Sequence, residues 1–224
     1  MKLALFLAAV PTAFGLQTSY LSQLGGGIAT SAGSSFFPAP TVTGGMEEMT
    51  TATSSVGSPP SQELVDLWSA QVSVELSASQ LYLSASIWFR SRGMNGMAAW
   101  MLDESGEERG HGLAILEHAM QKGFPVQLEP LNAPRSDWQN EVQVWEDILN
   151  AEQTNTQNLL NLAAAADRCG QYGCMAFLND FHLEQIEAEE TVGDILNKVR
   201  SGNNELLMQL DYDLGKEAES EDHH

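Results

Sequence analysis

The segment EERGH, residues 107–111, places a carboxylate and an imidazole where the sequence otherwise predicts an apolar helix face. Counting in sevens from Met101 gives Glu108 and then Ile115, so Glu108 lies on the stripe that faces a protein core. His111 follows three residues later and therefore lies on the same side of the helix. Because a buried carboxylate without a partner is costly, the pattern predicts that something compensates the charge of Glu108.

Three other helical segments also carry one polar side chain in the middle of a seven-residue apolar repeat. These side chains and their apolar neighbours are Glu75 with Trp68 and Tyr82, Glu152 with Trp145 and Leu159, and Gln185 with Leu178 and Val192. Taken alone, each glutamate fits an ion pair or a surface position. Three buried carboxylates at one level need positive charge nearby, and a divalent cation would supply it. Oxygen ligands with one imidazole favour iron or manganese over thiolate-bound zinc.

Five helical segments position these side chains, and no β-period of any length is present from residue 61 onward. The predicted helices run from Ser61 to Phe89, Met97 to Lys122, Asp137 to Arg168 and Cys174 to Arg200, with a short fifth helix from Glu205 to Gly215. Glycine-containing breaks end the long helices. The long, proline-containing connection between the second and third helices predicts an all-α, four-helix bundle with a crossover, as in ferritin-like folds.

The composition limits the classes of partner. The chain has 30 acidic and 10 basic side chains among 224 residues, a formal charge of −20. This charge argues against nucleic acid and anionic membranes as partners and suits metal cations, although an acidic surface also serves solubility alone. The two cysteines, Cys169 and Cys174, form neither a disulfide framework nor a zinc motif.

The chain divides into four parts. Residues 1–15 read as a signal peptide, residues 16–60 as a Ser/Thr/Gly/Pro-rich disordered leader, residues 61–215 as the helical domain and residues 216–224 as an acidic tail. The signal and leader resemble the bipartite plastid presequences of algae, and the mature form is expected to lack a membrane segment. The leader lacks the basic residues usual in transit peptides, so secretion or an endomembrane location is the alternative.

The helical domain is similar to a ferritin over residues 61–215. The matching segments are QVSVELSASQLYLSAS, EERGH, NAEQTNTQNLLNLA, FLNDFHLEQIEAEE and LLMQLDYDLG, the last of which resembles the final helix of bacterial-type ferritins. The resemblance implies iron storage with a ferroxidase centre, where two Fe(II) are oxidised by dioxygen and the Fe(III) product mineralises. It also implies a homo-oligomer, a hollow 24-subunit shell.

Nine residues match iron-binding or catalytic positions of that family. The first iron site corresponds to Glu75, Glu108 and His111, with Glu108 bridging to the second site. The second iron site corresponds to Glu152, with Gln185 positioning water or dioxygen and Tyr82 hydrogen-bonded beside the centre. A third iron site of bacterial-type ferritins corresponds to Glu107, Glu184 and Glu187, for which a solvated acidic face is the alternative.

Some positions depart from the family pattern. Gly110, Leu113 and Ala188 stand where related chains carry glutamates for mineral nucleation or extra iron binding. No methionine is identifiable as a haem ligand, so the resemblance implies a non-haem protein. Two other functions remain open. One is a different di-iron enzyme, such as a rubrerythrin-like peroxidase, which usually adds a four-cysteine module. The other is a passive cage subunit, which typically lacks the first-site residues.

Overall fold

The computed structural model of the protein describes residues 60–221, which form five helices and no strand. The helices are α1 (Gln62–Arg90), α2 (Asn95–Gln121), α3 (Glu141–Arg168), α4 (Tyr172–Arg200) and α5 (Asn204–Glu221). The predicted all-α architecture is therefore confirmed. The predicted signal, the leader up to residue 59 and residues 222–224 of the predicted tail lie outside the described part of the chain.

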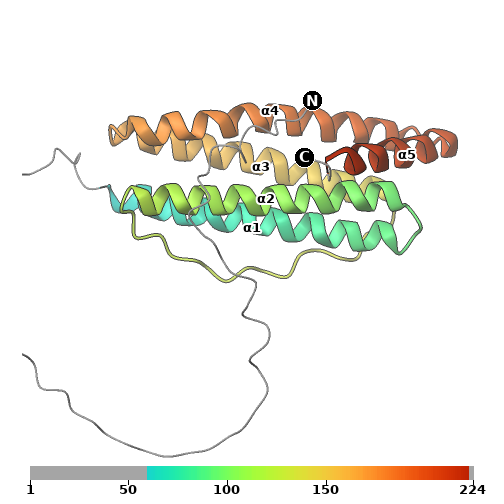
Figure 1. Cartoon of the computed structure of the whole chain (residues 1–224), viewed down its shortest axis with the longest axis horizontal. Helices are drawn as coiled ribbons and strands as arrows, with labels where there is room; N and C mark the ends of the chain where they lie inside the picture. Colours follow the sequence, from blue (N-terminus) through green and yellow to red (C-terminus); the bar gives the residue numbers. More distant parts are fainter. Residues whose placement is uncertain (1–59, 222–224) are drawn as a thin grey trace, which may run out of the picture. The chain divides into compact units, whose positions relative to one another are not determined.

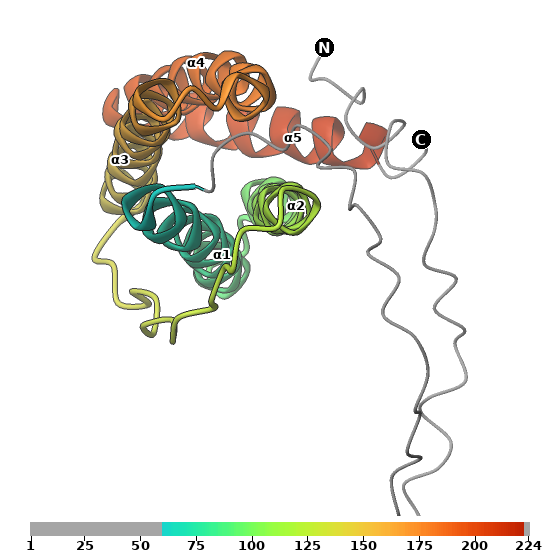
Figure 2. The ribbon, with the colours of Figure 1, turned by 90° about the vertical axis from the view of Figure 1, so that its left-hand side faces the viewer.

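The first four helices form a bundle made of two antiparallel pairs (Figures 1 and 2). α1 packs against α2 and α3 packs against α4, while α1 and α3 join the pairs. The backbones of α2 and α4 lie farther apart than those of the two antiparallel pairs, so side chains must be long to reach from α2 to α4. The connection between α2 and α3 runs along the length of the bundle (Figure 1), which makes α2 and α3 parallel. This is the predicted crossover.

Local signals determine where the helices begin and end. Ser61 caps α1 by accepting a hydrogen bond from the Leu64 amide at 3.2 Å. Gly123, with φ of 72°, adopts the left-handed conformation after α2, as the sequence predicted. The predicted start of the third helix at Asp137 was four residues too early. Asn140 has an extended backbone and caps α3 through the Gln143 amide, so the helix begins at Glu141.

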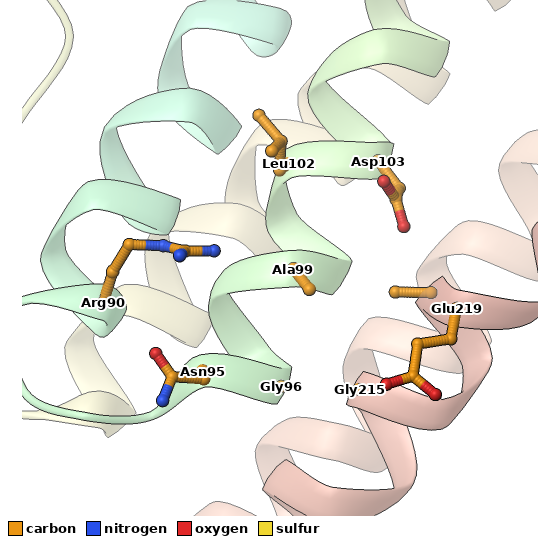
Figure 3. Close-up of a pocket in the computed structure, with 9 residues that line it drawn as sticks. Arg90, Asn95, Gly96, Ala99, Leu102, Asp103, Gly215 and Glu219 are labelled. Atoms are coloured by element: carbon orange, nitrogen blue, oxygen red, sulfur yellow. The ribbon is translucent and has the colours of Figure 1, made fainter. Parts of the chain in front are cut away.

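α5 is longer than predicted and packs against α2 as well as α4. It continues past Gly215 to Glu221, so residues 216–221 of the predicted acidic tail are helical. Gly96 of α2 faces Gly215 of α5 (Figure 3), and a Cβ atom on Gly215 would lie 3.0 Å from the Gly96 Cα. Asp211 of α5 accepts a hydrogen bond from the Met97 amide at 2.8 Å, so it caps α2 from a neighbouring helix.

The apolar core of the bundle is interrupted at one level by polar side chains. Above and below that level, every apolar residue of the predicted seven-residue repeats is buried. These buried residues are Trp68, Tyr82, Met101, Ile115, Trp145, Leu159, Leu178 and Val192. No helix in residues 60–221 is long and apolar enough to cross a membrane. Both cysteines are free thiols.

Candidate metal centre

The four polar side chains predicted on the apolar stripes are all buried. The exposed fraction is 0% for Glu75, 6% for Glu108, 2% for Glu152 and 6% for Gln185. They come from α1, α2, α3 and α4 in that order. One polar residue from each helix therefore reaches the interior of the bundle.

Glu75, Glu108 and His111 form a compact group of possible metal ligands. One ligand atom from each residue lies within 4.8 Å of the others. His111 Nδ1 is 3.7 Å from Glu108 Oε2, which is longer than a hydrogen bond. Glu108 Oε2 is buried and has no hydrogen-bond partner among the described residues. A buried acceptor of this kind fits a cation held jointly by the three side chains.

Glu152 forms the other half of the centre, and two side chains hold it in place. The Tyr82 hydroxyl donates a hydrogen bond to Glu152 Oε1. Gln185 Nε2 donates to Glu152 Oε2 at 2.5 Å and also to the Glu152 carbonyl at 3.1 Å. The resemblance to ferritins assigned these three residues to one iron site, and in the structure Tyr82 and Gln185 both contact Glu152.

Two buried amides that the sequence analysis missed connect the two halves. Asn155 Nδ2 donates to Glu75 Oε2 at 3.1 Å and to Gln185 Oε1 at 3.3 Å. Gln71 Nε2 donates to Glu75 Oε1 at 2.7 Å and to Asn155 Oδ1 at 2.6 Å. Both lie one helical turn from a predicted ligand, Gln71 before Glu75 and Asn155 after Glu152. A search for polar residues at that spacing would have found them.

The electrostatics of the centre favour the uptake of positive charge. Burial raises the pKa of Glu75 well above its usual value, and the neighbouring Glu108 carboxylate raises it further. Burial also raises the pKa of Glu108, although His111 opposes the change. For Glu152, burial raises the pKa while the hydrogen bonds from Tyr82 and Gln185 oppose the change. The three carboxyl groups thus hold their protons more tightly than they would in water.

His111 and Tyr82 respond to the same carboxylates. Burial by itself lowers the pKa of His111, but interactions with Glu108 and Glu184 outweigh burial and raise this pKa well above its usual value. Burial and the charges of Glu152, Glu104 and Glu108 raise the pKa of Tyr82, which keeps its phenol protonated. His111 therefore carries some of the positive charge that the carboxylates attract.

The predicted third set of ligands is only partly brought together. Glu184 Oε2 lies 3.3 Å from His111 Nε2, so Glu184 reaches the edge of the first group. Glu107 and Glu187 are exposed on the surfaces of α2 and α4. Within residues 60–221, Glu107, Glu184 and Glu187 do not make up a second compact group of three ligands.

The cavity at the junction of α2 and α5 is separate from this centre. It has a volume of about 280 Å³ and is lined by side chains such as Arg90, Asn95, Asp103 and Glu219 (Figure 3). None of the nine predicted site residues lines it. The candidate functional site is therefore the buried polar level formed by the four helices α1 to α4, and not this cavity.

Comparisons with known proteins agree with this geometry. The family model described as "Ferritin-like domain" matches residues 66–201. The chain is 29% identical over 160 residues to a bacterial non-heme ferritin of Bacteroides fragilis (strain 638R), covering 70% of this chain and 98% of the relative. A bacterial non-heme ferritin of Staphylococcus saprophyticus is 29% identical over 150 residues, with 66% and 90% covered.

Solved structures give the same result at higher identity. The crystal structure of apo-ferritin from Pseudo-nitzschia multiseries is 47% identical, with a TM-score of 0.66, and the match covers 68% of this chain and 98% of that one. A variant of PmFTN soaked in iron for 5 min is 49% identical, also with a TM-score of 0.66, and 68% and 99% of the chains are covered.

Proposed function

This chain belongs to the ferritin family, and from that premise we propose that it stores iron and oxidises it at the buried centre formed by the four helices α1 to α4. The observation that carries the proposal is the group formed by Glu75, Glu108 and His111, in which the buried Glu108 Oε2 has no hydrogen-bond partner in the part of the chain that the structure describes. Iron is here the substrate and the cargo. The iron-soaked crystals of a similar protein support iron as the metal.

We propose the roles within the centre from the resemblance to ferritins together with the contacts of each side chain. Glu75, Glu108 and His111 bind the first Fe(II), and Glu108 bridges to a second Fe(II) that Glu152 binds. Tyr82 and Gln185 fix the orientation of Glu152. Each carboxyl group gives up its proton as iron arrives, because a ligand must be deprotonated. The anionic oxygen ligands then favour Fe(III) over Fe(II).

The reaction needs both metals in one place. Two Fe(II) at a fixed separation each give one electron to the same dioxygen molecule, so the two-electron step becomes intramolecular. The amide bridge made by Gln71 and Asn155 supports this role because it holds both halves of the centre at a fixed spacing. The Fe(III) product then leaves the centre and mineralises inside a shell.

The direct test is oxygen consumption by the purified, metal-free protein after two Fe(II) per chain are added. We expect rapid uptake that saturates near that ratio. Uptake no faster than an iron-only blank would overturn the enzymatic part of the proposal, and the centre would then only bind iron.

We propose in addition that Glu184 and Glu187, with Glu107, accept iron that leaves the centre. Glu184 supports this role because it already contacts His111. The double substitution Glu184→Ala with Glu187→Ala should slow later rounds of iron addition more than the first round. Stopped-flow absorbance over successive iron additions measures the first and the later rounds. A double variant whose rates equal those of the wild type in every round would contradict the third site.

The shell and the cellular location are further parts of the proposal. Several large apolar side chains are exposed on a single chain, which supports burial between copies in a 24-subunit shell. Residues 1–60 are proposed to direct the protein to an algal plastid. A fluorescent protein fused behind residues 1–60 in an algal cell would test this, and fluorescence in the medium or endomembranes would contradict it.

A further inference from the structure

Four of the five tryptophans of the chain lie on one side of the candidate iron centre. Trp88, Trp100, Trp138 and Trp145 belong to one buried cluster together with Tyr82. The ring centroids of Tyr82 and Trp100 are 6.3 Å apart, and those of Trp100 and Trp145 are 5.4 Å apart. Tyrosine and tryptophan are the side chains in this cluster that lose an electron most easily.

The series continues from Trp145 to the surface of the bundle. The Phe89 ring lies between Trp145 and Trp88, with centroid distances of 6.0 and 5.2 Å. The Trp88 and Trp138 centroids are 6.3 Å apart. Only the step past Phe89 requires tunnelling across a ring that is hard to oxidise. The remaining steps join rings that oxidise readily.

Both ends of this series lie where a redox route needs them. At the inner end, the Tyr82 hydroxyl donates a hydrogen bond to Glu152, a proposed iron ligand. At the outer end, Trp88 and Trp138 line a surface cavity of about 630 Å³, a volume suited to a small molecule. Neighbouring aromatic rings thus connect the two ends of the series.

The hydrogen bonds of the tryptophans differ along the route. The Nε1–H groups of Trp88 and Trp138 donate to the Trp138 carbonyl at 3.1 Å and to Asp147 at 2.7 Å. Trp145 Nε1 is buried and has no partner among the described residues. A buried N–H without a partner is costly for a purely structural residue. Because no group among the described residues accepts this N–H, an oxidised Trp145 keeps its proton and regains an electron from the next ring instead.

Charges at the outer end favour Trp138 as the last ring. The Arg92 guanidinium lies 3.6 Å from the centroid of Trp88, and its positive charge disfavours oxidation of that ring. Arg135 lies farther from Trp138, with its guanidinium carbon 5.8 Å from the ring centroid. The Asp147 carboxylate pairs with Arg135 and also accepts the Nε1–H of Trp138, so it offsets that positive charge and stabilises positive charge on the ring. An oxidised Trp88 therefore takes an electron from Trp138, which leaves Trp138 as the oxidised ring.

The cavity at this end suits an anionic ligand. Arg92 lines it and has no carboxylate partner within residues 60–221, in a chain with 30 acidic side chains. Asp137, which also lines the cavity, pairs with Arg135 instead. Ser84, Ser91 and Ser136 also line the cavity, together with Ile87 and Gln139. The hydroxyls of Ser84 and Ser91 donate to backbone carbonyls, so their oxygens can accept hydrogen bonds from a ligand. A small anion with hydroxyl groups matches these features.

Together these observations lead us to propose that the tryptophan route carries electrons, one at a time, from an anionic enediol in the Arg92 cavity to the iron centre. The proposal rests on the proposed oxidation of iron. Two Fe(II) supply two electrons and reduce dioxygen to hydrogen peroxide with two protons. Two more electrons from the route, with two more protons, reduce that peroxide to two water molecules.

The protons and electrons balance at both ends. Tyr82 gives its electron to the oxidant and its phenolic proton to Glu152, and recovers both when an electron arrives from Trp100. Each enediol molecule, of the ascorbate class, loses one electron and one hydroxyl proton, so two molecules are used per peroxide. The second activity is thus an enediol-dependent removal of peroxide at the site of its formation.

The test locates oxidative damage in the full-length protein after repeated additions of Fe(II) in air without a donor. Peptide mass spectrometry should find oxidised Trp138. In Trp145→Phe, this oxidation should be lost and should appear at Tyr82 and Trp100 instead. Trp100→Phe is a second variant in case the first does not fold. In this variant, oxidation should be confined to Tyr82. The matched control Trp68→Phe, on the other side of the centre, should keep the wild-type pattern.

Ferric absorbance in the same samples separates the two proposals. No ferric product above the blank would mean that the proposed function has failed. Normal ferric product with the same damage pattern in Trp145→Phe and wild type would overturn the route. Ascorbate should protect Trp138, and Arg92→Gln should need more ascorbate for equal protection. Equal protection in both would overturn the donor site.

Discussion

At the scale of single residues, the Glu108 carboxylate is the most informative group. Its Oε2 atom is buried and has no hydrogen-bond partner within residues 60–221, and His111 Nδ1 on the same helix lies 3.7 Å away. A bundle selected only for stability would replace such a group by an apolar side chain, because buried ionisable groups are often neutral or unfavourable for folding. In the proposed function, the centre therefore lowers the stability of the metal-free protein and in exchange binds iron.

Glu108→Gln tests this trade directly. The substitution keeps the shape of the side chain and removes the ionisable group, so we expect iron oxidation to fall to the level of the blank. The free energy of unfolding of the metal-free protein should stay equal or rise. Oxygen electrode traces and urea unfolding measure the two effects. Fast oxidation by the variant would remove Glu108 from the centre.

The pH dependence of stability tests the electrostatics. The folded-state pKa values of Glu75, Glu108 and Glu152 lie above the ordinary value of 4.5, so their contribution to stability is fully present below pH 4.5. This contribution is lost as the pH rises through the folded-state values. His111 acts in the same direction, because its pKa is also raised.

We therefore expect the metal-free wild type to lose stability relative to Glu108→Gln as the pH rises from 4.5. Urea unfolding of both proteins across a pH series measures the difference. The two proteins should be closest in stability at the acid end. A difference that is constant over the whole series would show that ionisation of Glu108 is not its cause.

At the scale of helices, the α2–α5 junction depends on two glycines that approach each other closely. Gly96 of α2 lies against Gly215 of α5 (Figure 3). A Cβ atom at Gly96 would lie 1.6 Å from the Asp211 carbonyl oxygen, so any larger residue forces α5 away from α2. The same contact places Asp211 at the Met97 amide. The start of α2 and the docking of α5 thus depend on each other.

Gly96→Ala should cost about 1–3 kcal/mol through this clash. The matched control is Gly106→Ala in the same helix, where a new Cβ meets nothing within 4 Å. The control should gain about 0.5–1 kcal/mol, because alanine favours the helix. Urea unfolding measures both, and hydrogen exchange should show α5 protected less in Gly96→Ala. Equal effects of the two substitutions would contradict the docking of α5 described here.

At the scale of the whole molecule, the surface of one chain is acidic and also apolar in places. The formal charge of −20 attracts cations from solution, which serves a protein that collects iron. Met208 and Tyr212 of α5 are 76% and 61% exposed, and Ile186 of α4 is 64% exposed. Such side chains favour burial between copies of the chain.

The double substitution Met208→Ser with Tyr212→Ser should weaken assembly without disturbing the bundle, because neither side chain belongs to its buried core. We expect sedimentation velocity to show smaller particles than the wild type, with unchanged helicity by circular dichroism. Gln153→Ser, an exposed polar position on α3, is the control and should leave the particle mass unchanged. A double variant with the wild-type particle mass would place α5 outside the interface.

The sequence by itself determined the features that depend on local periodicity. A repeat of seven places Glu75, Glu108, Glu152 and Gln185 on buried stripes, and three-residue spacing places His111 beside Glu108. Glycines such as Gly123 marked the helix ends because few other residues adopt a left-handed backbone. These relations follow from the geometry of one helix and need no knowledge of its neighbours.

Only the tertiary structure decided which side chains from different helices touch. The bridge from Gln71 through Asn155 to Gln185, the contact of Glu184 with His111 and the series of aromatic rings all depend on how the helices rotate and cross. The docking of α5 likewise depends on Gly96, which lies more than 100 residues earlier in the chain. Helical periodicity gives the face of each residue, whereas packing between helices selects its partner.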